Sequence, residues 1–136
     1  MVKLIQMMNI MKTITQENKD LLLKDLCARL PYDVKVQTTY INKETKERKD
    51  IGTDILGTVE ISLLIEGCEE HKPYLFPMSS MTRKQEREWQ SLMVCDIYGI
   101  FYHTIESFDY LYKNHIDIRG LIPTGLAIDA TGLNIY

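Results

Sequence analysis

The spacing of apolar residues changes at Pro31, and this change constrains the fold more than any other feature of the chain. Before Pro31, apolar residues recur every three or four positions, which is typical of a helix with one buried face. They are Leu22, Leu23, Leu26, Cys27 and Leu30. From Val34 to Tyr40, every second residue is suited to burial, which is typical of a half-buried strand. A proline disfavours the helical conformation of the preceding residue, so it separates a predicted helix over about 16–30 from this strand.

The middle of the chain predicts further strands. Ile51–Leu56 fits a short strand, and Thr58–Ile65 alternates so regularly that we expect it to be the clearest strand of the chain. Lys72–Pro77 contains a proline near each end, which favours an extended segment at the edge of a sheet. Two brief apolar stretches, at 94–102 and 126–129, each have room for one more short strand.

Two threonines predict helix starts in the second half of the chain. Thr82, followed three residues later by Gln85, has the form of a capping box, and Thr104 precedes a helix that we expect to reach about Asn114. The apolar stripe expected on this last helix consists of Ile105, Phe108, Leu111 and Tyr112. Residues 15–136 therefore predict a single α+β domain, with a small antiparallel sheet of three to five strands and about three helices.

The composition describes an ordinary globular chain of 136 residues, of which 45% are hydrophobic. The formal net charge of −3 argues against a general nucleic-acid-binding surface, and no apolar run approaches the ~18 residues of a membrane span. Three widely spaced cysteines favour reduced thiols in the cytoplasm, and Cys68-x-x-His71 matches no zinc signature, so we expect neither a metal nor a cofactor. Residues 1–14 are expected to be an N-terminal extension, either a short amphipathic helix or a non-native start.

The densest group of chemically active residues lies within His103–Ile122. A histidine, a carboxylate and an arginine can support acid–base chemistry when they converge. The candidate catalytic residues are His103, Glu106, His115, Asp117 and Arg119. No established catalytic motif accompanies them, so we favour structural roles: Glu106 complements its helix dipole, and Asp117 pairs with Arg119 to hold the following turn.

Hydroxyl groups and cations gather just before the helix predicted after Thr82. The free N–H groups at the start of a helix bind anions, so this segment is a candidate anion site. Its residues are Ser79, Ser80, Thr82, Arg83 and Lys84. A solvated surface explains the same pattern, because cations in the first turn of a helix cost little free energy.

Several aromatic residues fall outside the faces predicted to be buried. Exposed aromatic side chains often dominate the energetics of protein interfaces. The candidate interface residues are Tyr74, Phe76, Tyr102 and Tyr110. They favour a protein partner, whereas stacking on single-stranded nucleic acid would need a basic groove that the composition does not favour.

Three segments, KDLCARLPYDVKV, KPYLFPMSSMT and HTIESFDYLYKNHIDIRGLIPTGLAID, carry a resemblance that extends from about Leu21 to Ala130. They resemble a family of small uncharacterised proteins from Bacteroides-type gut bacteria and their phages and prophages. The resemblance implies a mobile-element origin, a location in the bacterial cytoplasm and a chain that starts near the first helix. It lends no activity, cofactor or catalytic residue.

We therefore expect a non-enzymatic accessory protein of a phage or prophage, which docks on a host or phage protein. The alternative is a small enzyme or a nucleotide- or nucleic-acid-binding domain. That alternative would use the His103–Arg119 residues or the helix start at Ser79–Lys84. Convergence of these side chains in one concave pocket would favour the alternative, whereas separate positions on the surface would count against it.

Overall fold

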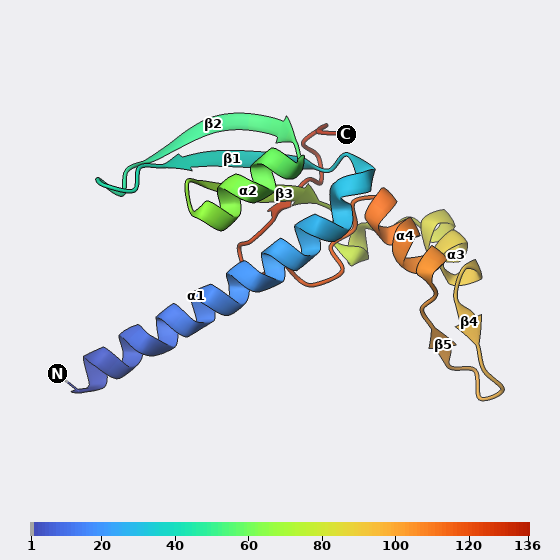
Figure 1. Ribbon diagram of the computed structural model, residues 1–136. Helices are drawn as coiled ribbons and strands as arrows, with labels where there is room; N and C mark the ends of the chain where they lie inside the picture. Colours follow the sequence, from blue (N-terminus) through green and yellow to red (C-terminus); the bar gives the residue numbers. More distant parts are fainter. Residues whose placement is uncertain (1) are drawn as a thin grey trace.

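The computed structural model describes the backbone of residues 2–136 and the side chains of residues 16–136, and it confirms the expected α+β class (Figure 1). The helices are α1 (Val2–Arg29), α2 (Thr58–Glu66), α3 (Arg83–Ser91) and α4 (Ile105–Lys113). The strands are β1 (Lys35–Ile41), β2 (Arg48–Ile55), β3 (Glu69–Leu75), β4 (Val94–Cys95), β5 (Phe101–Tyr102) and β6 (Ile128–Asp129). Short 3-10 helices follow α1 and β3, at Leu30–Tyr32 and Met78–Ser80.

Helix α1 begins at Val2, and the start predicted at about Gln16 is wrong. The helix ends where the sequence predicted, because Pro31 follows directly in the 3-10 turn. The amphipathic pattern expected for residues 1–14 falls on side chains outside those that the structure describes.

Four strands form one mixed sheet in the order β2-β1-β3-β6. Strand β1 pairs antiparallel with β2 and β3, whereas β6 pairs parallel with β3. Strand β3 is therefore internal, and the expectation that Lys72–Pro77 lies at a sheet edge is wrong. Pro73 is tolerated because β6 pairs only with Tyr74 and Leu75, which leaves Pro73 with a strand neighbour on one side alone.

Helix α2 occupies the segment predicted to be the clearest strand, so that prediction is wrong. Gly57 is the N-cap residue, and its backbone N–H donates a hydrogen bond to Glu60 Oε2 at 3.0 Å. Gly67 ends the helix with φ 79°, a left-handed conformation that glycine adopts at low cost. Local contacts thus fix both ends of the helix.

Burial in α2 follows the helical period. Ile61 and Leu64, three positions apart, are buried in the core. Val59 and Ile65, which the alternation placed on one strand face with Ile61, are 67% and 56% exposed. Two of the residues whose alternation favoured a strand therefore lie on the outer surface of a helix, because tertiary packing overrides a weak local preference.

Replacing Gly67 by alanine should lower the free energy of unfolding by about 1 kcal/mol, because an L-residue is strained at a left-handed φ. No heavy atom lies within 4 Å of the Cβ that alanine would add, so the loss would come from the backbone conformation and not from a clash. Urea unfolding followed by circular dichroism measures this change. Asparagine tolerates the left-handed region better, so Gly67→Asn should lose less, and equal losses would contradict the explanation.

Four of the five residues predicted for the buried face of α1 lie in the core or pack against it, and Cys27 is the exception. Leu22 and Leu26 are buried as expected, but Cys27 is exposed, and its assignment to the core is wrong. Asp25 and Arg29 take buried positions instead, each with no exposed surface. Residues four apart lie on one helix face, so these two side chains meet and enter the core as an ion pair.

The main core lies between one face of the sheet and helices α1 and α2, and the loop before β6 contributes to it. Its buried residues are Leu22, Leu26, Val34, Val36, Leu56, Ile61, Leu64, Leu75, Leu121 and Ala127. A smaller cluster of Met81, Leu111 and Ile116 holds α4 in place, and Trp89 of α3 packs against it. Figure 1 shows α3, α4 and the β4–β5 hairpin together at one end of the sheet.

The segment after β6 packs back against the sheet. The Tyr136 hydroxyl donates a hydrogen bond to the Tyr74 carbonyl at 2.8 Å and accepts one from the Lys35 backbone N–H at 2.9 Å. Lys35 Nζ in turn donates to the Ile135 carbonyl at 2.6 Å. The Tyr136 ring stacks on His115, with 3.7 Å between ring centroids. This segment therefore ties β1, β3 and the end of α4 together.

Candidate functional site

His103 and Glu106 lie near the start of α4, where His103 has a packing role. Its Nδ1 is 3.2 Å from Ser107 Oγ, and its ring stacks on Phe108 with 4.5 Å between centroids. Ser107 Oγ also accepts a hydrogen bond from the Thr104 backbone N–H, so these contacts fix the first turn of the helix. Glu106 is exposed in that turn, where a carboxylate complements the helix dipole.

Asp117 and Arg119 do not pair with each other, so the contact expected between them is wrong. The Asp117 carboxylate accepts hydrogen bonds from the backbone N–H groups of Leu121 and Ile122, at 2.9 and 3.0 Å. Arg119 Nη1 donates to Asp25 Oδ1 of α1 at 2.8 Å. Both residues still have the structural roles that the sequence favoured, but with different partners.

Asp25 also binds a second arginine, which sequence reasoning missed. Arg29 Nε lies 2.7 Å from Asp25 Oδ2, and Arg29 Nη2 donates to the Ile116 carbonyl at 2.7 Å. The guanidinium carbons of Arg29 and Arg119 lie 5.2 and 5.9 Å from the centroid of the Tyr112 ring. This cluster joins α1 to α4 and to the loop after it, so its function is to hold the fold together.

His115 follows the C-cap residue of α4, and its side chain contacts none of the other candidate catalytic residues by hydrogen bond or ion pair in the described part of the chain. Its φ of 57° is left-handed, its ring stacks on Tyr136, and its Nδ1 is buried without a hydrogen-bond partner. Burial, with the nearby positive charge of Arg29, lowers the pKa of His115 to about 4. In the described part of the chain, no hydrogen bond or ion pair joins any two of the five candidates. The structure therefore does not assemble them into one catalytic site.

The stability of the protein should fall as the pH is lowered through the range between the ordinary His pKa of 6.5 and the value of about 4 for His115. In that range the unfolded chain binds a proton that the folded chain does not, so the free energy of unfolding rises with pH. Burial also lowers the pKa of His71, which adds an effect of the same sign. Urea midpoints measured across this range should vary less in His115→Asn, which does not titrate there and tolerates the left-handed φ. An unchanged pH dependence in that variant would contradict the role of His115.

The candidate anion residues form a helix cap and an exposed surface. Thr82 Oγ1 accepts a hydrogen bond from the Gln85 backbone N–H at 3.1 Å, which confirms the capping box. Ser80 Oγ donates to the Pro77 carbonyl at 2.6 Å. Ser79, Arg83 and Lys84 are exposed, and Lys84 Nζ lies 3.9 Å from Glu88 Oε1. The cations thus lie on a solvated helix face.

Three of the four candidate interface residues offer little free surface. Tyr74 is buried in β3, and Phe76 is half-buried beside Tyr136. The half-buried Tyr110 donates its hydroxyl to Glu88 at 2.9 Å, and burial together with this bond raises the pKa of Tyr110 to about 12. Tyr102 alone is 52% exposed, and it lies on the β4–β5 hairpin.

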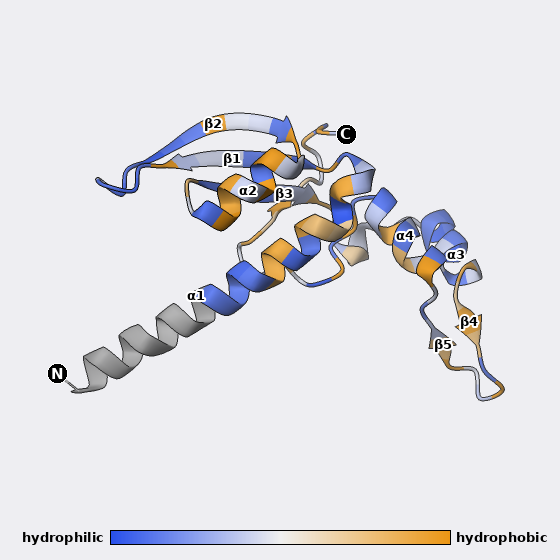
Figure 2. Cartoon of the chain, in the orientation of Figure 1, coloured by the Kyte–Doolittle hydropathy of each residue, from blue (hydrophilic) through white to orange (hydrophobic). Residues whose placement is uncertain are grey.

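The β4–β5 hairpin and the first residue of α4, residues 94–105, form a projecting segment that we call the arm. Figure 1 shows it extending away from α3 and α4, and Figure 2 shows apolar residues along it. Ile97 and Tyr98, at its tip, are 91% and 81% exposed. The exposed apolar residues of the arm are Val94, Ile97, Tyr98, Ile100, Phe101, Tyr102 and Ile105. The arm is therefore the main apolar surface at this end of the molecule.

Asp96 organises the turn of the arm from within. Its Oδ1 accepts hydrogen bonds from the backbone N–H groups of Tyr98 and Ile100, at 2.8 and 3.0 Å. Its Oδ2 accepts one from the Tyr102 hydroxyl at 3.0 Å. The Ile100 and Tyr98 backbone bonds are major causes of a lowered Asp96 pKa. Gly99 completes the turn with φ 79°.

Sequence reasoning found the arm only as a stretch with room for a strand. Its signal was an Asp and a Gly between two short apolar runs, which is typical of a hairpin turn. The stripe expected for the last helix also misplaced two residues, because Ile105 is 79% exposed and Phe108 is 37% exposed. Ser107 and Leu111 are the buried residues of α4. Apolar residues normally predict burial, but no element of the described chain covers the apolar side chains of the arm.

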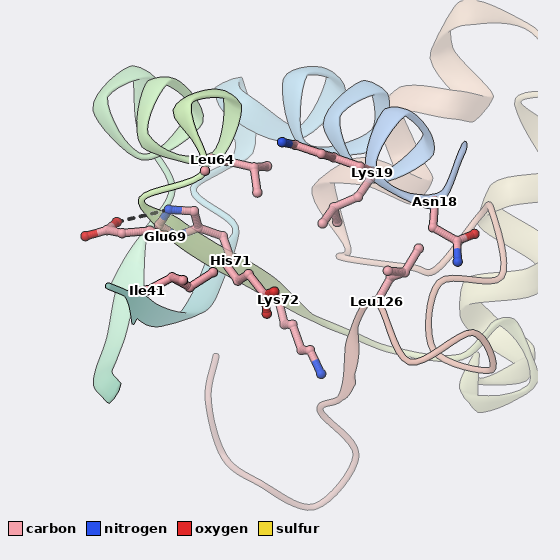
Figure 3. Close-up of a pocket in the computed structure, with 11 residues that line it drawn as sticks. Asn18, Lys19, Ile41, Leu64, Glu69, His71, Lys72 and Leu126 are labelled. Carbon is pink, nitrogen blue, oxygen red and sulfur yellow. Dashed lines mark ion pairs between the residues drawn. The ribbon is translucent and has the colours of Figure 1, made fainter. Parts of the chain in front are cut away.

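Cavities also lie elsewhere in the described part of the chain. One of about 270 Å³ lies between α1, α2 and the sheet, and His71 on its wall is fully buried (Figure 3). The His71 ring is turned toward Glu69, with Nε2 3.2 Å from Glu69 Oε2 and Nδ1 3.0 Å from Thr38 Oγ1. The apolar residues that line this cavity are Leu22, Ile41, Leu64 and Leu126.

A second cavity, of about 410 Å³, brings together three residues proposed from separate sequence patterns. They are Phe76, Ser80 and His115. Ser80 already donates to a backbone carbonyl and His115 is stacked on Tyr136, so neither is set beside a reactive partner. None of the other candidate catalytic residues lines this cavity.

No group of three or more His, Cys, Asp or Glu side chains within the described residues is arranged to hold a metal ion. Over the same part of the chain, no helix combines the length and the apolar character needed to cross a membrane. Comparison with family models, with curated proteins and with solved structures found no match for this chain.

Proposed function

We propose that this protein is a non-enzymatic binding module that docks on another protein chain through the arm. The observation that carries the proposal is the exposure of seven large apolar side chains on the projecting arm. Following the resemblance to proteins of Bacteroides-type bacteria and their phages, we place this activity in an accessory protein of a phage or prophage that acts in the bacterial cytoplasm.

The size of the apolar surface supports a protein partner. Three of the seven side chains are aromatic, and a buried aromatic side chain removes about 150–250 Å² from water. Together with the four aliphatic side chains, which are half to almost fully exposed, they offer on the order of 800 Å² over the whole arm. A single protomer's share of a standard protein interface is ~800 Å².

The construction of the arm supports the same proposal. Strands β4 and β5 have two residues each and pair only with each other among the described strands. A lone two-stranded hairpin is marginally stable in water, because no further strand or helix covers its apolar side chains. A partner that covers the arm would supply that burial. The enzyme alternative has less support, because no hydrogen bond or ion pair among the described residues joins any two of its five candidate residues.

Photo-crosslinking inside cells tests the proposal. A photoreactive phenylalanine analogue placed at Tyr98 should form one discrete crosslinked product, because Tyr98 would lie inside the interface. The matched control is the same analogue at Val59, which is 67% exposed on α2 and lies outside the arm. Mass spectrometry of the product identifies the partner. Crosslinking from Tyr98 that is as weak or as scattered as that from Val59 would overturn the proposal.

A further inference from the structure

We infer that the partner covering the arm is a second copy of this chain, so that two arms pack together about a twofold axis. This inference rests on the proposed function and names its partner. Three properties of the arm carry it: its lack of free charge, its unpaired strand edges and its area.

The arm offers nothing that would select a partner by charge. Asp96 is the only Asp, Glu, Lys or Arg in residues 94–105. Both of its carboxylate oxygens already accept hydrogen bonds from within the arm, as described above. Two identical arms can therefore meet without bringing free like charges together, and the one buried carboxylate would keep its hydrogen bonds.

The outer edge of β4 or β5 can form backbone hydrogen bonds with the same edge of a second protomer. Neither strand has a second strand neighbour among the described residues, so each has one unpaired edge. Two copies of the same strand pair antiparallel about a twofold axis, and such an interface needs only one patch per protomer. An unpaired edge of this kind is a template for another chain.

The area of the arm also fits a dimer. The surface of on the order of 800 Å² estimated above is what each protomer contributes to a standard interface. A lipid membrane fits the arm less well as a partner. Hairpins and helices that bind anionic membranes carry Lys or Arg beside their apolar residues, whereas the charged residue of the arm is an aspartate.

Sedimentation equilibrium over a wide range of protein concentrations tests the inference. The wild-type chain should form a dimer, and the double variant Ile97→Asp, Tyr98→Asp should raise the dimer dissociation constant by at least about tenfold, because it buries four carboxylates at the interface. Both side chains are largely exposed to solvent in the monomer, so the variant should fold normally. Circular dichroism checks this. Val59→Asp on α2 is the matched control and should leave the constant unchanged.

Each other outcome overturns the inference. A chain that is monomeric at every concentration has no self-interface, and a dimer that is insensitive to the arm variant associates through another surface. Binding of a monomeric wild-type chain to phosphatidylglycerol vesicles, lost in the variant, would assign the arm to lipid instead. A monomer whose Tyr98 crosslinks to a different protein would overturn the dimer but leave the proposed function standing. A monomer with no crosslink from Tyr98 would overturn both.

Discussion

Replacing Asp25 by asparagine should lower the free energy of unfolding by about 3–5 kcal/mol, which is the usual cost of breaking a buried ion pair. Asp25 is the carboxylate partner of both Arg29, which has no exposed surface, and Arg119. Without its charge, the Arg29 guanidinium would remain buried with only the Ile116 carbonyl and the Tyr112 ring to compensate it. Urea unfolding at neutral pH measures the change.

The control for this experiment lies on the same helix. Glu17 is exposed on α1, so Glu17→Gln removes an equal charge without breaking a buried contact, and it should change stability by less than about 0.5 kcal/mol. A loss in Asp25→Asn no larger than in Glu17→Gln would show that the cluster does not hold α1 to α4.

Replacing Leu26 by alanine should cost about 2–5 kcal/mol, because the change leaves a cavity in a packed core. Leu26 has no exposed surface, and it belongs to the core between α1, α2 and the sheet. Cys27, the next residue, is exposed, so Cys27→Ala should change stability by less than about 0.5 kcal/mol. Urea unfolding measures the free energy of unfolding of both variants, and so compares a buried position of α1 with the exposed position beside it.

Thiol labelling provides an independent check of this helix face. In the folded protein, Cys27 should react with a maleimide almost as fast as in the unfolded chain. The sequence alone placed Cys27 in the core, where it would be protected until the protein unfolds. Slow labelling of Cys27, together with a large loss in Cys27→Ala, would restore that prediction.

The helix starts that depend on local contacts were predictable. Thr82 caps α3 and Thr104 caps α4, because the capping hydrogen bond joins residues three apart in the sequence. Such contacts form without help from distant parts of the chain. The α+β class was predictable for a related reason, since the helix before Pro31 and the strand after it have different apolar periods.

The error at α2 has a physical cause. In a segment this short, the apolar positions expected for a strand and for a helix partly coincide. The apolar pattern alone therefore does not distinguish a strand from a helix. Gly57 with Glu60, and Gly67 at the other end, were local signals for a helix. The regular alternation between them outweighed these signals in the prediction, although Val59 and Ile65 contribute little to the core.

The buried cluster and the arm were beyond sequence reasoning. The bond between Asp25 and Arg119 joins residues 94 positions apart, and no local pattern indicates it. The spacing of Asp25 and Arg29 permits an ion pair, but it does not distinguish a solvated pair from a buried one. Apolar residues at 94–105 predict burial in any chain, and only the fold shows that the rest of the chain leaves them uncovered.

The way the last residues return to the sheet has a consequence for synthesis on the ribosome. Tyr136 bonds to residues 62 and 101 positions earlier, and β6 pairs with a strand more than 50 positions before it. Strand β3 therefore has an open edge until residues 128–136 have left the exit tunnel. Contacts this distant in sequence form slowly, and an open strand edge can pair with another nascent chain. Completion of the sheet should thus wait for the synthesis of residues 128–136, and β3 is most exposed to aggregation until they pack against it.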